Sequence, residues 1–217
     1  ASYDKTIRIW NPQSGREERK ILGQIGPRYG EIYSIALSPD GKLLVSGGYL
    51  GEFTGNRERA DEPSNWIRLH DFQSGELLQI LKGHENVVND LAFSPDGRWL
   101  VSGSGDYKVR LWKRSGSRFN AGPVMRGHEN DVYAVRLFED SGRLRVVSAS
   151  LDHTIRLWDA ESGRQLALGR HENRANSLAV GPDWIASAGY EKTIRVWDYS
   201  LKPLRTIHSE TEPTGLS

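Results

Sequence analysis

Three groups of side chains in this sequence combine a histidine, a serine and an acid, which are the residue types of a hydrolytic triad. In such a triad the histidine takes the proton of the serine hydroxyl while the acid orients the histidine. Because an enzyme rarely needs three copies of one triad, and because no Gly-x-Ser-x-Gly elbow is present, the repetition favours a structural role. The three groups are His84, Ser102 and Asp106; His128, Ser148 and Asp152; and His171, Ser187 and Glu191.

Each group is followed by a tryptophan that ends a short alternating run, such as TIRLW at residues 154–158. In this run isoleucine and leucine face one side, and threonine, arginine and tryptophan face the other. β-Branched and aromatic residues favour strands, so each run is predicted to be a strand. The tryptophan position is filled by Trp10, His70, Trp112, Trp158 and Trp197, at spacings of 60, 42, 46 and 39 residues. Three of these spacings lie near the roughly 40–45 residues of a four-stranded propeller blade.

Turn signals separate the predicted strands. The tetrapeptide SPDG occurs at 38–41 and 94–97, where proline fixes φ and glycine tolerates a positive φ. QSG, RSG and ESG follow the tryptophan strands and supply glycine for a tight turn into another strand. No window shows a convincing helical pattern, so the chain is predicted to consist of strands and turns.

The motifs and their order resemble the WD-repeat (WD40) β-propeller family. The matching features are the Gly-His dipeptides at 83–84 and 127–128, the SPDG turns, the D-x-T-I-R-L-W-D run at 152–159 and the spacing of about 40 residues. The resemblance covers nearly the whole chain, and several copies in a fixed order make it specific. It implies an all-β fold, a β-propeller of four-stranded antiparallel blades.

The resemblance also implies what the three polar groups do. In WD repeats such residues form a buried network that runs from aspartate through histidine and serine to the indole N–H, and it holds the strands of a blade together. The sequence departs from the pattern at His70, which replaces a tryptophan, at Glu191, which replaces an aspartate, and at Arg170, which replaces the glycine before His171. The expected network residues are His84, Ser102, Asp106 and Trp112; His128, Ser148, Asp152 and Trp158; and His171, Ser187, Glu191 and Trp197.

The repeats predict one domain, 1–217, with a fixed internal order. Residues 1–20 are expected to be the third and fourth strands of a split blade, and 208–217 the start of a further one. Complete blades are expected at 21–80, with an insertion at 49–66, and at 81–124, 125–168 and 169–207. A seven-bladed ring needs about 300 residues, so we expect a fragment of a larger propeller. The alternative is a five-bladed ring with one incomplete blade.

A partner is expected on the top face, where the loops that enter the first strands meet the loops that join second to third strands. Because Val88 should point into its blade, Val87 and Asn89 should point toward the mouth of the channel. In similar WD domains these positions contact peptides, and tyrosine and arginine carry much interface energy. The alternative is a solvated rim whose tyrosines cover glycine-rich turns. The predicted partner-binding residues are Tyr3, Glu31, Tyr33, Val87, Asn89, Asp131, Tyr133, Leu151, Arg174, Asn176 and Tyr190.

The insertion at 49–66 is a second candidate binding element, because long loops on rigid scaffolds are often functional. It opens on the same expected face and mixes aromatic and charged residues. Its candidate contact residues are Phe53, Arg57 and Arg59. A passive loop is the alternative.

Composition limits the remaining classes of function. The formal net charge of +1 gives no global case for binding nucleic acid or a membrane surface. The absence of cysteine removes disulfides and thiolate chemistry and fits a reducing compartment, so a cytoplasmic location is predicted. No metal-binding motif and no phosphate loop is present, and no cofactor or metal is expected.

We therefore interpret the chain as a non-catalytic protein–protein interaction scaffold that docks peptides or protein domains, as the sensor or docking module of a larger protein or complex. No membrane and no small-molecule substrate is expected. A nucleic-acid-binding propeller is an alternative, suggested by Arg57, Arg59 and Arg174 near tyrosines but opposed by the nearby acids. A propeller enzyme with a channel active site is the least favoured alternative, since it needs an acidic, histidine or metal cluster outside the repeated network.

Overall fold

The computed structural model describes residues 6–22, 31–49, 65–211 and 213, and every regular element in these ranges is a β-strand. The strands pair in antiparallel fashion into one two-stranded sheet and four four-stranded sheets. Each four-stranded sheet consists of four strands that are consecutive in the chain. This confirms the predicted all-β fold of four-stranded antiparallel blades.

The strand bounds follow the repeat. The two-stranded sheet contains β1 (Thr6–Trp10) and β2 (Glu17–Leu22). The first four-stranded sheet contains β3 (Glu31–Leu37), β4 (Leu43–Tyr49), β5 (Ile67–Asp71) and β6 (Leu77–Leu81). The second contains β7 (Val88–Phe93), β8 (Trp99–Ser104), β9 (Val109–Ser115) and β10 (Arg118–Met125). The third contains β11 (Val132–Asp140), β12 (Arg143–Ser150), β13 (Thr154–Asp159) and β14 (Gln165–Arg170). The fourth contains β15 (Ala175–Val180), β16 (Ile185–Gly189), β17 (Thr193–Trp197) and β18 (Pro203–His208).

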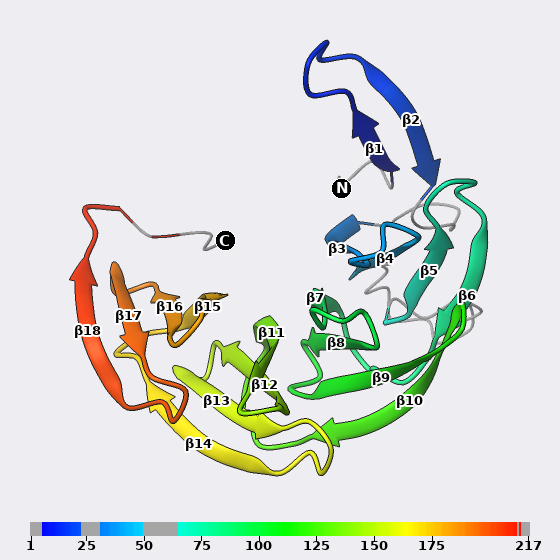
Figure 1. Ribbon diagram of the computed structural model, residues 1–217. Coiled ribbons are helices and arrows are strands. Elements are labelled where there is room, and N and C mark those ends of the chain that lie inside the picture. Colours follow the sequence, from blue (N-terminus) through cyan, green and yellow to red (C-terminus); the bar gives the residue numbers. More distant parts are fainter. Residues whose placement is uncertain (1–5, 23–30, 50–64, 212, 214–217) are drawn as a thin grey trace, which may run out of the picture.

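The sheets follow one another around an open arc (Figure 1). The first strands β3, β7, β11 and β15 lie on the inside of the arc, and the fourth strands β6, β10, β14 and β18 lie on the outside. The β1–β2 hairpin and the β15–β18 sheet stand at the two ends of the arc. In a meander of antiparallel strands, the turn between the first two strands and the turn between the next two lie at opposite edges. In every four-stranded sheet, the loop that enters the first strand and the turn between the second and third strands therefore lie at the same ends of the strands. We call the surface formed by these loops and turns the top face.

The SPDG segments form the predicted tight turns at the opposite edge. Ser38 accepts the Leu43 amide through its hydroxyl at 2.9 Å and donates to Asp40, which also accepts the Lys42 amide at 3.1 Å. Gly41 has a φ of 68°, a conformation that glycine adopts without steric cost. The second copy repeats these bonds from Ser94. Side chains of the turn thus satisfy its own backbone and fix the first hairpin of the first and second four-stranded sheets.

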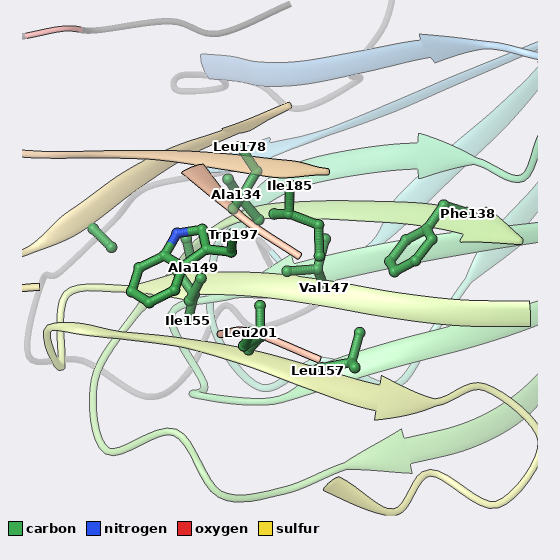
Figure 2. Close-up of a cluster of buried hydrophobic side chains, with 11 residues drawn as sticks. Ala134, Phe138, Val147, Ala149, Ile155, Leu157, Leu178, Ile185, Trp197 and Leu201 are labelled. Atoms are coloured by element: carbon green, nitrogen blue, oxygen red, sulfur yellow. The ribbon is translucent and has the colours of Figure 1, made fainter. Parts of the chain in front are cut away.

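Neighbouring sheets are held together by apolar side chains between their faces (Figure 2). One cluster joins Val147 and Ile155 of the third sheet to Leu178, Ile185 and Trp197 of the fourth, and all five are buried. Burying one large apolar side chain contributes about 1.5–3 kcal/mol, so such a cluster is the main attraction between adjacent sheets. The result is a stiff support for the residues at the sheet edges.

Candidate functional site

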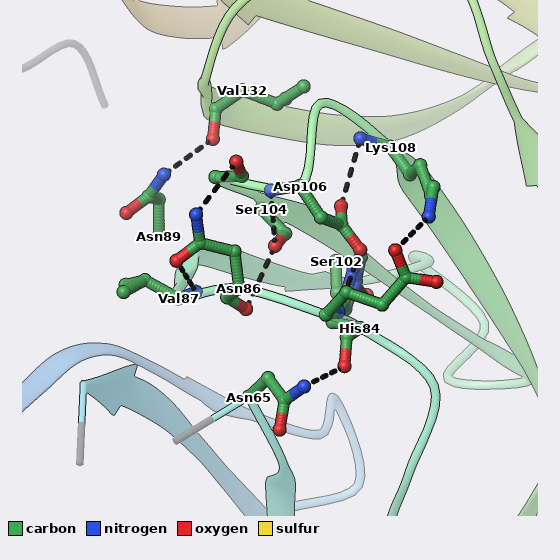
Figure 3. Close-up of polar contacts among 12 residues, drawn as sticks. Asn65, His84, Asn86, Val87, Asn89, Ser102, Ser104, Asp106, Lys108 and Val132 are labelled. Atoms are coloured by element: carbon green, nitrogen blue, oxygen red, sulfur yellow. Dashed lines mark hydrogen bonds and ion pairs between the residues drawn. The ribbon is translucent and has the colours of Figure 1, made fainter. Parts of the chain in front are cut away.

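The second four-stranded sheet contains a buried chain of four hydrogen-bonded side chains, three of which are labelled in Figure 3. His84, in the loop before β7, contacts Asp106 through Nδ1 at 2.9 Å and Ser102 of β8 through Nε2 at 2.7 Å. The indole N–H of Trp112 on β9 donates to the same hydroxyl at 3.0 Å. The loop, the second strand, the turn and the third strand are therefore tied together by one hydrogen-bonded chain.

The third sheet repeats the arrangement with its own residues. His128 contacts Asp152 at 2.8 Å and Ser148 at 2.7 Å, and the Trp158 indole donates to Ser148 at 2.8 Å. The Thr154 hydroxyl donates to the other carboxylate oxygen at 2.6 Å. Both oxygens of the carboxylate thus have donors, which is what a buried charge requires.

In the fourth sheet the chain contains a glutamate. His171 contacts Glu191 at 2.5 Å and Ser187 at 2.6 Å, and Trp197 donates to Ser187 at 2.8 Å. Thr193 donates to the same Glu191 oxygen at 3.0 Å, while the other oxygen, Oε2, is buried without a hydrogen-bond partner. The longer acid therefore completes the chain but leaves one oxygen unsatisfied.

These chains do not present a reactive serine. Donation from His84 Nδ1 to the carboxylate makes Nε2 an acceptor for the Ser102 hydroxyl, and Trp112 occupies that hydroxyl's oxygen. Ser102 is fully buried, so its hydroxyl cannot reach a substrate. Burial lowers the pKa of His84, although the neighbouring carboxylate opposes this effect. Burial alone would raise the pKa of Asp106, but hydrogen bonds from His84 and two backbone amides bring it to about 2. A neutral histidine thus faces an ionised acid inside the sheet.

The first four-stranded sheet differs where the sequence departs from the repeat. His70 takes the tryptophan position on β5 and is buried, with Nδ1 3.3 Å from the carbonyl oxygen of Gly75. Its Nε2 is buried without a hydrogen-bond partner, and burial lowers the pKa of this histidine. Replacing the tryptophan thus leaves a buried polar atom unsatisfied in this sheet.

The predicted partner-binding residues meet in pairs at the top face. In the second, third and fourth sheets the amide of the residue after the second strand donates to the carbonyl of the residue before the first strand. The pairs are Gly105 with Val87 at 2.9 Å, Leu151 with Asp131 at 3.0 Å, and Tyr190 with Arg174 at 3.0 Å. In the first sheet Glu31 lies opposite Tyr49 in the strand register. The loop residues and the strand entries therefore form one continuous edge.

A β-bulge recurs at the entry of each first strand, which the sequence reasoning did not anticipate. The register shifts between Val88 and Asp90, and it shifts at the equivalent place in the other three sheets. A bulge adds one unpaired residue and turns its side chain away from the regular alternation. The bulged residues are Tyr33, Asn89, Tyr133 and Asn176, all of them predicted contact residues.

The structure brings some of the predicted residues close together and keeps others apart. Tyr133 lies within electrostatic range of Asp131, Tyr190 and Arg174, all from the third and fourth sheets. Tyr133 and Tyr190 are 40% and 37% exposed, and Arg174 is also exposed. Tyr33 lies on β3, two sheets away along the arc, where its hydroxyl donates to Glu31 at 2.6 Å. The predicted contact tyrosines therefore do not form a single cluster, because Tyr33 lies apart from Tyr133 and Tyr190.

Two equivalent asparagines behave differently. The Asn89 side chain donates to the carbonyl of Val132 on the next sheet at 3.1 Å and so links two sheets (Figure 3). Asn176 occupies the same position in the fourth sheet, and its Oδ1 is buried without a hydrogen-bond partner. Asn89 is therefore at least partly a structural residue.

Sequence reasoning missed Asp90 of β7, whose carboxylate contacts the first strands of both neighbouring sheets. Oδ1 accepts the Ser34 hydroxyl of β3 at 3.2 Å, while Oδ2 accepts the Val135 amide of β11 at 2.9 Å and an N–H of Arg136 at 2.7 Å. The signal in the sequence is an acid in the run VVNDLAF, which is apolar except for Asn89 and Asp90. The bulge at Asn89 reverses the direction expected for the Asp90 side chain.

Several predicted residues lie outside the described part of the chain. These are Tyr3 and the three candidate residues of the insertion, Phe53, Arg57 and Arg59. Among the residues that the structure does describe, no group of three or more histidine, aspartate or glutamate side chains could hold a metal ion. In the same ranges, no helix has the length and apolar character needed to cross a membrane.

Comparison with known proteins gives a consistent picture. The family model described as "WD domain, G-beta repeat" matches residues 20–51, 75–113, 122–159 and 164–198. Nuclear distribution protein PAC1 of Arthroderma otae is 26% identical over 238 residues, which cover 95% of this chain and 49% of that protein. Protein HIR1 of Yarrowia lipolytica is 25% identical over 215 residues, which cover 85% of this chain and 20% of that protein. Nuclear distribution protein nudF of Aspergillus niger is 31% identical over 137 residues, covering 61% and 30%. The chain spans about half the length of the first of these relatives.

Proposed function

This chain belongs to the WD40 repeat family, and from that premise we propose that it is a non-catalytic scaffold that docks peptides or protein domains on its top face. The mechanism is presentation: stiff sheets hold variable side chains at one edge, and a partner binds across several of them. The fully buried serines of the polar chains support a structural role for those chains rather than catalysis.

The observation that carries this proposal is the repeated bulge at the top face. It places one side chain per sheet at the equivalent position of the first strand. In the third sheet this side chain is Tyr133, which lies within electrostatic range of Tyr190 and Arg174. Tyrosine and arginine are enriched among residues that dominate binding energy. Tyr190 and Arg174 are joined by a backbone hydrogen bond, and positions held in this way lose little conformational entropy on binding.

Two finer features belong to the same proposal. The PAC1 relative is about twice the length of this chain, since the match covers 95% of this chain and 49% of that protein, so we place the chain within a larger protein or complex as its docking module. A cytoplasmic location remains a prediction from the absence of cysteine.

The proposal is tested by selecting peptides from a displayed random library on the whole chain. We then compare their binding to the double variant Tyr133→Ser/Tyr190→Ser. The matched control is Arg98→Ser/Glu161→Ser, two exposed residues in turns at the opposite edge. Selected peptides should lose about tenfold or more in affinity for the tyrosine variant and should bind the control unchanged. Equal binding to all three proteins would place recognition elsewhere.

A further inference from the structure

The first and third sheets carry the same pair of residue types at the top face but use it differently. In the first sheet Tyr33 donates its hydroxyl to Glu31 at 2.6 Å, so the acid already has a donor. In the third sheet the equivalent residues are Asp131 and Tyr133, and the acid is one methylene shorter. Among the described residues, no other residue donates a hydrogen bond to the Asp131 carboxylate, and no cation lies within ion-pair distance of it. The third sheet therefore presents an acid that lacks a partner.

The position of this carboxylate makes the missing partner costly. Asp131 is half-buried, and its Oδ2 would lie 3.5 Å from a Cβ built on Gly105 of the preceding sheet, so the acid sits against a turn without a side chain. Burial raises the pKa of Asp131, although its own backbone amide partly offsets this effect. A partly desolvated carboxylate without a donor gains more from an incoming cation than a solvated one does.

Two exposed tyrosines belong to this part of the top face. Tyr133 follows it by two residues, and Tyr190 of the next sheet is near enough to affect the pKa of Tyr133, which burial raises first and the Asp131 charge raises further. Both rings are more than a third exposed. The face of a tyrosine attracts a lysine or arginine head group, most strongly where water is partly excluded. Aromatic faces and a carboxylate thus favour the same type of ligand.

The ion pairs of the neighbouring top-face loops do not include Asp131. Lys108 pairs with Glu85 at 2.8 Å, and Arg195 lies 3.4 Å from Glu172, so these two acids are compensated. Asp131 has no such cation among the described residues. Arg174 approaches Tyr133 from the fourth sheet, but it makes no ion pair with Asp131 and so marks the far boundary of the site.

We propose, on the basis of the proposed scaffold function, that Asp131, Tyr133 and Tyr190 form a site for a lysine or arginine side chain of a protein partner. The carboxylate receives the charged N–H groups of the partner, and the two rings cover its apolar stem and cationic head. Arg174 disfavours a second cation on the side of the fourth sheet. The partner segment is thus cationic at one position rather than uniformly basic.

The test uses the whole ¹⁵N-labelled chain and three acetylated, amidated glycine–serine nonapeptides that differ only at the centre. The central residue is arginine, citrulline, which has nearly the same shape without the charge, or glutamate. We expect the arginine peptide to shift the Tyr133 and Tyr190 amide signals with a Kd on the order of 1 mM, and the other two peptides to bind about tenfold more weakly. No shift with the arginine peptide at about 10 mM, or equal binding of citrulline, would overturn the proposal.

Variants separate this site from general electrostatic attraction. Asp131→Asn should weaken arginine-peptide binding about tenfold, whereas the matched variant Glu31→Gln should have no effect because Tyr33 already satisfies that acid. Arg174→Gln should leave binding unchanged or strengthen it. A melting temperature equal to that of the wild type shows that Asp131→Asn folds. Binding of an oligothymidine that Arg174→Gln weakens would point to nucleic acid instead and overturn the inference.

Failure of the proposed cation site can be distinguished from failure of the proposed scaffold function. Peptides selected on the chain that depend on the top-face tyrosines, but contain no lysine or arginine and bind Asp131→Asn normally, would leave the scaffold function intact and refute the cation site. Selected peptides enriched in a single lysine or arginine, and sensitive to Asp131→Asn, would support both.

Discussion

The carboxylate of Glu191 occupies the space beside Gly189 that a side chain would need. A Cβ built on Gly189 would overlap Oε2 of Glu191 and lie 2.7 Å from its carboxyl carbon and from Nδ1 of His171. The second and third sheets have serine at this position, Ser104 and Ser150, next to the shorter acids of their chains. The longer acid at position 191 therefore leaves room only for a glycine at position 189.

This relationship predicts a coupled pair of substitutions. Gly189→Ser alone should lower the free energy of unfolding by about 1–3 kcal/mol, because the new side chain has no room beside Glu191. Adding Glu191→Asp should recover most of that loss, since it restores the combination found in the third sheet. Urea denaturation of the two single variants and the double variant measures the coupling, which should exceed about 1 kcal/mol. Additive effects would show that the two positions are independent.

The acid of the third sheet offers a direct test of the structural role of the polar chains. Asp152→Ala leaves His128, the Glu129 amide and the Thr154 hydroxyl without their acceptor. The expected loss in free energy of unfolding is about 1–3 kcal/mol. Thermal and urea melts measure it, with Glu161→Ala, an exposed acid of a nearby turn, as the control. Equal stability of both variants would mean that the chain does not hold the sheet together.

The sequence was sufficient for the strands and the turns because both depend on local patterns. Alternation in TIRLW and the chemistry of SPDG are properties of a few neighbouring residues, and the structure shows the corresponding strands and turns. His84, Ser102 and Asp106 could be grouped from the sequence only because the same combination recurs in two further repeats. The structure joins the members of each of the three groups by hydrogen bonds.

The top face could be predicted only in part. Strict alternation from Val88 predicts a direction for Asn89, but it cannot show the bulge at this residue, which places Asp90 toward its neighbouring sheets. The division between Tyr33 and Tyr133 was also beyond reach, because it depends on one methylene in the adjacent acid and on which sheets are neighbours. Contacts between repeats are not encoded in the pattern within a repeat.

Acid should destabilise the fold through its buried histidines. Burial lowers the pKa of His70, His84, His128 and His171 below the ordinary histidine value of 6.5, so the unfolded chain binds protons more readily than the folded chain does. The stability that these neutral histidines provide is complete above pH 6.5 and is lost as the pH falls below it. Each histidine contributes a slope of up to about 1.4 kcal/mol per pH unit.

Urea denaturation at pH 7.5, 6.5 and 5.5 measures this effect. The free energy of unfolding should fall between the last two points. A further loss is expected from pH 3.8 downward, where Asp106, with a folded pKa of about 2, is protonated more readily in the unfolded chain. A free energy of unfolding that stays constant from pH 7.5 to 5.5 would contradict the neutral, buried state of these histidines.

Asp90 provides the test of how the sheets are held in the arc. Its carboxylate receives donors from Ser34 on one side and from Val135 and Arg136 on the other, so it joins β3, β7 and β11 at the inner surface. Asp90→Ala should lower the free energy of unfolding by about 2–3 kcal/mol, because an amide and a guanidinium lose a charged acceptor. Ser34→Ala should cost about 1 kcal/mol through the lost bond to the Leu91 amide.

The double variant distinguishes a shared link from two separate contacts. If Asp90 and Ser34 act in one network, their combined loss should be smaller than the sum of the single losses. Hydrogen exchange at the Val135 amide should accelerate in Asp90→Ala and stay near the wild-type rate in the exposed control Asp183→Ala. Protection of Val135 that survives the loss of Asp90 would mean that the second and third sheets are held in place without this carboxylate.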